Sequence, residues 1–141
     1  LKSLVNKYKG EDGFDGLNIG RLTMNMMRAA AKSEADGDAE SAAALDLMSS
    51  LTGMTVADYE DCSVKVRKAF NRDLERMLNG VELLMSVKED GDNVFIYGHI
   101  LPNGKEVEDV VISVPGDGAL VCFFGRIDMD KVGTLVKMAE E

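Results

Sequence analysis

The sequence is poor in the residues on which many reaction centres and nucleic-acid surfaces depend. Of its 141 residues only one is histidine and two are cysteine, and 25 acidic residues against 16 basic ones give a net charge of −9. A single histidine excludes zinc sites built on several histidines. Two cysteines allow one disulfide at most, far from the density of a disulfide-stapled scaffold. The negative charge repels a phosphate backbone, so we do not expect nucleic-acid binding.

Long hydrophobic runs and nucleotide-binding glycine motifs are missing as well. No stretch approaches the roughly 20 apolar residues that span a bilayer, and the start, LKSLVNKYKG, lacks the apolar block of a signal peptide. The glycines in GEDGFDG and PGDG have neither the strand-to-helix setting of GxGxxG nor the lysine of a P-loop, and no GxSxG elbow is present. We therefore expect a chain that is soluble as given and that uses no nucleotide, cofactor or metal.

What is present indicates one globular α+β domain. The length and a composition of 45% hydrophobic and 29% charged residues are typical of a single domain, here predicted over residues 1–141. Apolar residues at helical spacing predict helices over 20–32, 64–78 and 129–139. Between the first two, the acidic stretch near 33–41 predicts a mobile loop.

The predicted helix over 64–78 has the clearest boundaries. Asp61 or Ser63 can cap its start and Gly80 can end it. Its apolar face is expected to be core: Val66, Ala69, Phe70, Leu74, Met77 and Leu78. It also carries a basic stripe, unusual in so acidic a chain: Lys65, Lys68, Arg72 and Arg76. One interpretation of the stripe is a solvated helix face, and the other is a site for an anionic ligand, lipid headgroup or acidic partner.

Four strands are predicted in succession after this helix. VELLMSVK alternates, with Val81, Leu83, Met85 and Val87 expected on its buried side. NVFIYGHIL, VEDVVISV and ALVCFFGRI follow, separated by turns that include an Asn-Gly pair and PGDG. A short strand over 54–57 precedes the helix. We therefore predict a mainly antiparallel sheet that includes a C-terminal four-stranded meander, with the helices packed on one face.

The stretch KEDGDNVFIYGHILPNGKEV, residues 88–107, raises the question of a metal loop beside a catalytic histidine. An EF-hand loop that began at Asp90 would have Phe95 at position six, where glycine is required, so we interpret the stretch as two turns around a strand. His99 shares one side of this strand with Phe95 and Tyr97. Because the strand is apolar on both sides, we predict that one side is uncovered and binds a ligand or partner.

Thiol or histidine chemistry is the enzyme alternative. Cys62 precedes the long helix, where backbone N–H groups and the helix dipole favour a thiolate, although three neighbouring carboxylates oppose it. His99 is the one candidate general base. Cys122 lies in an apolar strand and is most simply a small buried hydrophobe. Whether Cys62 and Cys122 form a disulfide depends on geometry that the sequence leaves open.

Several stretches together resemble the bacterial domain-of-unknown-function family 4252. They are KY…G…L.I near the start, MTVADYED before the long helix, and ELLMSVKEDGDNVFIYGHI…VEDVVISV…GALVCFFGRIDMDKVGTLVK. The resemblance implies a small exported protein of Gram-negative envelopes, periplasmic or outer-envelope, whose precursor carries a signal or lipoprotein leader. Peripheral membrane association is then expected only through a lipid anchor lost before Leu1. The family implies no established activity and no catalytic residues, and the acidic SEADGDAESAAA stretch departs from its pattern.

Three functional hypotheses follow. The leading one is a non-enzymatic envelope domain that binds a protein partner or small ligand, because catalytic constellations are missing from the sequence. The second is a hydrolytic or thiol enzyme that uses Cys62 or His99. The third is a structural protein that assembles through a sheet edge or through the helix bearing Met24, Met26 and Met27. For the chain in general we expect a monomer or weak homo-oligomer.

Overall fold

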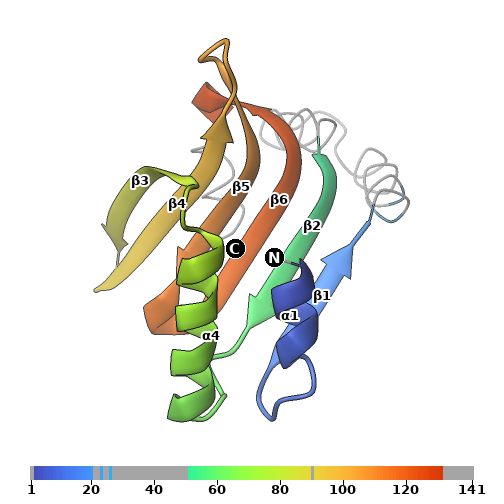
Figure 1. The fold of residues 1–141 in the computed structure, drawn as a ribbon, viewed down its shortest axis with the longest axis vertical. Helices are drawn as coiled ribbons and strands as arrows, with labels where there is room; N and C mark the ends of the chain where they lie inside the picture. The colour runs from blue at the N-terminus through green and yellow to red at the C-terminus, as the bar shows by residue number, and fades with distance from the viewer. Residues whose placement is uncertain (1, 21–22, 24–25, 27–50, 90, 132–141) are drawn as a thin grey trace, which may run out of the picture.

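Six strands form one antiparallel sheet in the order β1-β2-β6-β5-β4-β3. The computed structural model describes residues 2–20, 23, 26, 51–89 and 91–131. Its elements are α1 (Lys2–Tyr8), β1 (Asp15–Ile19), β2 (Leu51–Asp58), α4 (Val64–Met77), β3 (Glu82–Glu89), β4 (Asp92–Ile100), β5 (Glu106–Val114), the 3₁₀ helix η1 (Pro115–Asp117), β6 (Ala119–Asp128) and the 3₁₀ helix η2 (Met129–Lys131). Figure 1 shows α1 and α4 on the same side of the sheet. The predicted α+β class with a mainly antiparallel sheet is confirmed.

The strands of the C-terminal half lie where their sequence patterns place them. β3, β4, β5 and β6 are neighbours in chain order, each antiparallel to the next. The predicted strand over 54–57 is the centre of the longer β2. The predicted helix over 20–32 lies outside the described residues except for Gly20, Thr23 and Met26. The acidic loop near 33–41 and the predicted helix from residue 132 onward also lie outside them.

The two N-terminal elements were not predicted. β1 has the sequence DGLNI, whose Asp, Gly and Asn are depleted in strands, and it is held by pairing with β2 rather than by its own propensity. α1 places Leu4, Val5 and Tyr8 in the core, so the spacing of these three residues was the available signal.

The helix α4 begins and ends close to its predicted boundaries. Ser63 is the N-cap, and its Oγ accepts a hydrogen bond from the backbone N–H of Val66 at 3.3 Å. Leu78 is the C-cap, and Gly80 follows with a φ of +93°, which glycine adopts at little cost as the chain turns into β3. The residues predicted on the apolar face of α4 are buried or partly buried except for Met77, which is 43% exposed.

Phe70 anchors α4 to the rest of the domain. Its side chain is fully buried, and its ring lies 4.4 Å from that of Tyr59, 5.3 Å from that of Tyr8 and 5.4 Å from that of Phe14, measured between centroids. Tyr59 is also fully buried, and its hydroxyl donates a hydrogen bond to Oδ1 of Asn71 at 2.6 Å. This aromatic cluster joins α1, α4 and the end of β2, so it holds the orientation of α4 on the sheet.

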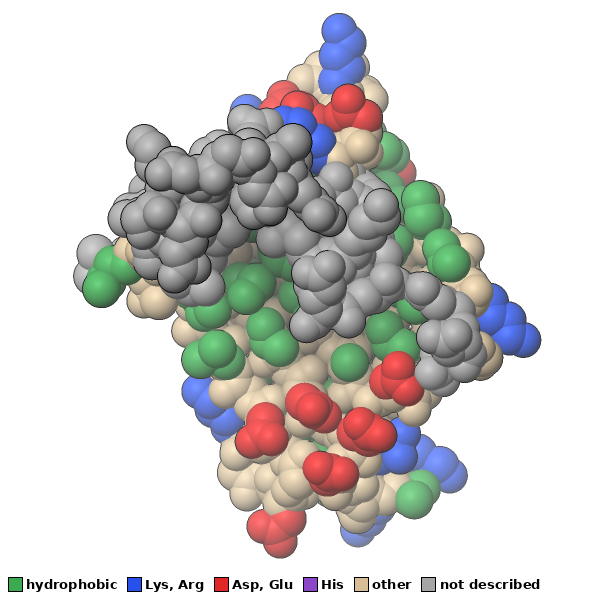
Figure 2. Space-filling view, turned by 180° about the vertical axis from the view of Figure 1, so that it is seen from behind, with side chains coloured by type: hydrophobic (Ala, Val, Ile, Leu, Met, Phe, Trp, Pro, Cys, Tyr) green, Lys and Arg blue, Asp and Glu red, His purple; other side chains and the backbone are tan. Residues whose placement is uncertain are grey.

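The opposite side of the sheet is apolar as well. Along β5, Val111 packs in the core under α4 and α1, whereas Val110 and Ile112 belong to a second buried cluster on the other face. Figure 2 shows this face from behind, with apolar side chains above a group of acidic ones. Because both faces of the central strands are buried, these strands are continuously apolar rather than cleanly alternating.

Candidate functional site

The basic stripe predicted on the long helix lies on the surface of α4. Lys65, Lys68, Arg72 and Arg76 are all exposed. Their spacing of three, four and four residues puts them on one side of the helix. In the part of the chain that the structure describes, no carboxylate lies within ion-pair distance of any of the four. The stripe is therefore a local positive surface on a strongly acidic protein.

The nearby Asp73 is engaged elsewhere, in a contact between α4 and α1. Its Oδ2 accepts a hydrogen bond from the Tyr8 hydroxyl at 2.6 Å and lies 3.2 Å from Nζ of Lys7. The hydrogen bond from Tyr8, followed by that from Lys7, lowers the pKa of Asp73. Burial and the same hydrogen bond raise the pKa of Tyr8 to about 12. Asp73 thus fixes α4 against α1. The charge of Arg72 also lowers the pKa of Asp73, so this carboxylate offsets part of the positive charge of the stripe.

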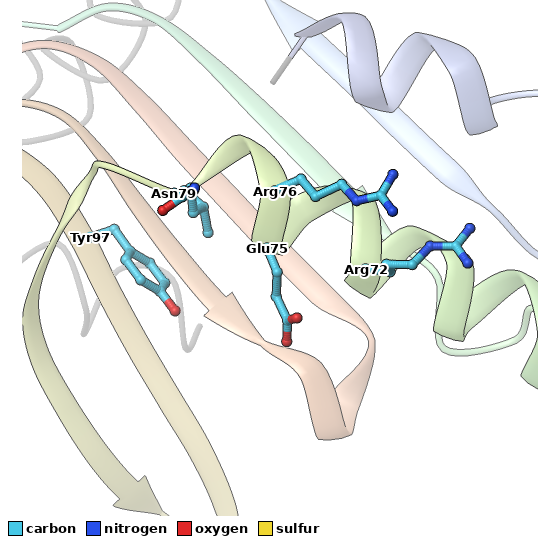
Figure 3. Close-up of a pocket in the computed structure, with 6 residues that line it drawn as sticks. Arg72, Glu75, Arg76, Asn79 and Tyr97 are labelled. Atoms are coloured by element: carbon cyan, nitrogen blue, oxygen red, sulfur yellow. The ribbon is translucent and has the colours of Figure 1, made fainter.

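An open pocket of about 400 Å³ joins the stripe to β4. It is lined by Arg72, Glu75, Arg76, Leu78, Asn79 and Tyr97. The structure therefore brings Tyr97 and two members of the stripe, which the sequence offered as separate candidates, to one place. In Figure 3 the guanidinium groups of Arg72 and Arg76 extend away from Tyr97, and Glu75 projects from a different side of α4. The guanidinium groups of the two arginines therefore lie on the surface of α4 more than in this pocket.

A second hollow, of about 320 Å³, lies between α1 and α4. It is lined by Ser3, Leu4, Lys7, Asp73, Arg76 and Met77. Arg76 lines both this hollow and the pocket beside β4. Sequence reasoning missed Leu4 and Lys7 because it did not predict α1.

The aromatic and histidine candidates on β4 share one face, as their spacing predicts. Phe95, Tyr97 and His99 lie opposite Ser113, Val111 and Glu108 of β5. Tyr97 packs against the core under α4, so all three side chains are on the α4 side of the sheet. Phe95 and Tyr97 are half-buried and His99 is exposed. The α4 side of β4 is therefore partly covered at Phe95 and Tyr97 and is exposed to solvent at His99.

The prediction that Leu83, Met85 and Val87 lie on the buried side of their strand is wrong. They are 52%, 45% and 37% exposed, because β3 is the edge strand of the sheet. The pairing also shifts between Leu83 and Met85, so that Leu83 lies opposite Tyr97 and Met85 opposite Ile96. Neighbouring residues of β4 point to opposite faces of the sheet. The apolar residues predicted on one side of β3 are therefore divided between the two faces of the sheet.

Both cysteines are buried and neither forms a disulfide. Burial, followed by the nearby carboxylate of Glu11, raises the pKa of the Cys62 thiol, and burial raises that of Cys122 to about 12. Both thiols are therefore protonated near neutral pH, whereas nucleophilic cysteines react as thiolates.

No three side chains of His, Cys, Asp or Glu within the described ranges are grouped so as to hold a metal ion. None of the helices described combines the length and hydrophobicity needed to cross a bilayer.

The model of a family described as Domain of unknown function (DUF4252) matches residues 8–135, which include the basic surface of α4 and the whole sheet. No curated protein and no solved structure matches the chain significantly.

Proposed function

We propose that this chain, which belongs to the family Domain of unknown function (DUF4252), is a non-enzymatic binding domain of the bacterial cell envelope that recognises an acidic segment of a protein partner through the basic face of α4. The observation that carries the proposal is the row of four exposed cations, which no described carboxylate pairs. The envelope location is part of the proposal and rests on the resemblance to exported proteins.

The stripe costs the isolated helix some stability. Lys68 and Arg72, and again Arg72 and Arg76, are like charges four residues apart, and each such pair destabilises a helix by about 0.2–0.5 kcal/mol. An acidic partner would remove this repulsion on binding. The stripe covers residues 65–76, which rise about 16 Å along the helix axis. About five residues of an extended acidic segment match that length.

The sheet supplies the support for this surface. We propose that the C-terminal strands act as a four-stranded meander and that α4 packs on one of its faces as a fixed platform. The aromatic contacts of Phe70 and the hydrogen bond between Tyr8 and Asp73 support that assignment, since both tie α4 to other elements.

Charge reversal tests the proposal. A short glutamate-rich peptide, labelled for fluorescence anisotropy, should bind the wild-type domain with an affinity that falls as salt is raised. The double variant Lys68→Glu/Arg72→Glu should bind it at least about tenfold more weakly, because two attractive contacts become repulsive. The matched control is Lys105→Glu/Arg126→Glu, which has the same net charge but alters exposed cations away from α4. Equal losses in the two variants would show that net charge alone matters and would refute the proposal.

Self-assembly is a second candidate function, and the edge strand β3 favours it. Leu83, Met85 and Val87 are exposed there, beside backbone groups that face outward from the sheet. In this case the wild-type mass measured by light scattering should rise with concentration. Val87→Lys should abolish the rise, whereas Leu17→Lys on the opposite edge strand, β1, should not. A constant wild-type mass would eliminate this candidate.

A further inference from the structure

We infer that the acidic segment carries an apolar side chain that inserts into the hollow between α1 and α4, next to Arg76. The inference rests on the proposed function, because it specifies the partner that the basic face would recognise. It adds a requirement that charge alone does not impose, namely one apolar residue at a defined place among the acidic ones.

The hollow is lined by apolar and charged side chains. Leu4 from α1 and Met77 from α4 form its apolar lining. Arg76 supplies positive charge, whereas the charge of Lys7 is paired with Asp73. Its volume of about 320 Å³ is at the lower end of the range of small-molecule sites, which suits one inserted group rather than a whole ligand. The carboxylate of Asp73, also in the wall, is held by Tyr8 and Lys7.

Met77 is the residue that points to an apolar occupant. It belongs to the apolar pattern of α4, yet 43% of it is exposed, whereas Leu74 and Leu78 on the same helix are buried. Covering an exposed apolar surface is favourable in proportion to its area. The flexible, polarizable side chain of methionine also adapts to different apolar groups and is frequent on binding surfaces.

Arg76 connects the hollow to the basic face. It is the last cation of the stripe and at the same time lines the hollow. A partner residue anchored on Leu4 and Met77 therefore has Arg76 beside it, and acidic residues adjoining the anchor would continue along Arg72 and Lys68. Asp73 is held by Tyr8 and Lys7, and Glu75 projects from a different side of α4, so the cations form a single row beside the hollow. A single row beside one apolar anchor point suits a peptide, whose carboxylates are spaced along one chain, better than the broad surface of an anionic membrane.

The test uses two short glutamate-rich peptides that are identical except for one central residue, leucine in the first and serine in the second. The full wild-type chain should bind the leucine peptide roughly tenfold more tightly, because a buried apolar side chain adds to the charge contacts. Met77→Ser should reduce this preference to below about threefold, since it removes part of the apolar lining of the hollow. The control, Val64→Ser, changes an apolar residue that is 65% exposed at the other end of α4 and should keep the full preference. Circular dichroism verifies that both variants are folded.

The outcomes separate this inference from the proposed function. If the wild type binds both peptides equally and Lys68→Glu/Arg72→Glu weakens both, the acidic site stands and the apolar anchor is refuted. If neither peptide binds, both are refuted. If Met77→Ser weakens binding to vesicles of phosphatidylglycerol but not to the leucine peptide, the occupant is a lipid and the inference of a protein anchor is overturned.

Discussion

Replacing Phe70 with alanine should remove the main anchor of α4. The ring is fully buried and lies within 5.4 Å, between centroids, of three other aromatic rings. Truncating a buried phenylalanine to alanine typically costs about 3–5 kcal/mol, through lost burial and the cavity left behind. Small domains are stable by about 5–15 kcal/mol in total, so this single change removes a large part of the margin.

Urea unfolding at equilibrium, followed by circular dichroism, measures the loss. With a denaturant slope of about 2 kcal/mol/M, the expected 3–5 kcal/mol moves the midpoint down by about 1.5–2.5 M. Phe70→Leu retains most of the apolar volume and should cost clearly less. Met77→Ala, at an exposed position of the same helix, should shift the midpoint least. A loss below about 1 kcal/mol for Phe70→Ala would contradict the assignment of the aromatic cluster as the anchor of α4.

Three further predictions concern a turn, a charge and the thiols. Gly118→Ala should destabilise the fold by at least about 1–2 kcal/mol in the same urea assay, because φ is +61° and the new Cβ would lie 2.5 Å from the backbone nitrogen of Glu60. An unchanged midpoint would contradict this. The pKa of Asp73 is lowered in the folded state, so its contribution to stability is complete above the unfolded value near 3.8 and is lost as pH falls through the folded value. The difference in Tm between wild type and Asp73→Asn should therefore shrink in strong acid, and a constant difference would show that Tyr8 and Lys7 do not favour the carboxylate. The two buried thiols should react with Ellman's reagent only as fast as the chain opens, and rapid labelling of the native protein would contradict their burial.

Local sequence patterns were sufficient to predict those elements whose structure depends mainly on their own residues. The helix α4 has a serine cap, a long apolar face and a glycine after its end, and each of these signals acts within a few residues. The turn before β5 is equally local, because Oδ1 of Asn103 accepts hydrogen bonds from the backbone N–H groups of Lys105 and Glu106. The strands on either side were predicted for the same reason.

Predictions failed where a residue's environment comes from distant parts of the chain. The alternation of β3 indicates a half-buried strand, but its place at the sheet edge and a shift in pairing leave Leu83, Met85 and Val87 exposed. β1 has a weak strand sequence and is held by β2, more than thirty residues away in the chain. Neither effect is visible in a local pattern.

The sequence by itself determined the α+β class, the position of α4 and the presence of four cations on one side of that helix, because helical spacing and capping are local properties. It also determined the acidic character of the chain against which those cations stand out. Only the tertiary structure decided that Asp73 is held by α1, that Arg76 lines a hollow together with Leu4 and Met77, and that Cys62 is buried. Each of these depends on packing between segments far apart in the chain, which sets the burial and the charge partners of a side chain.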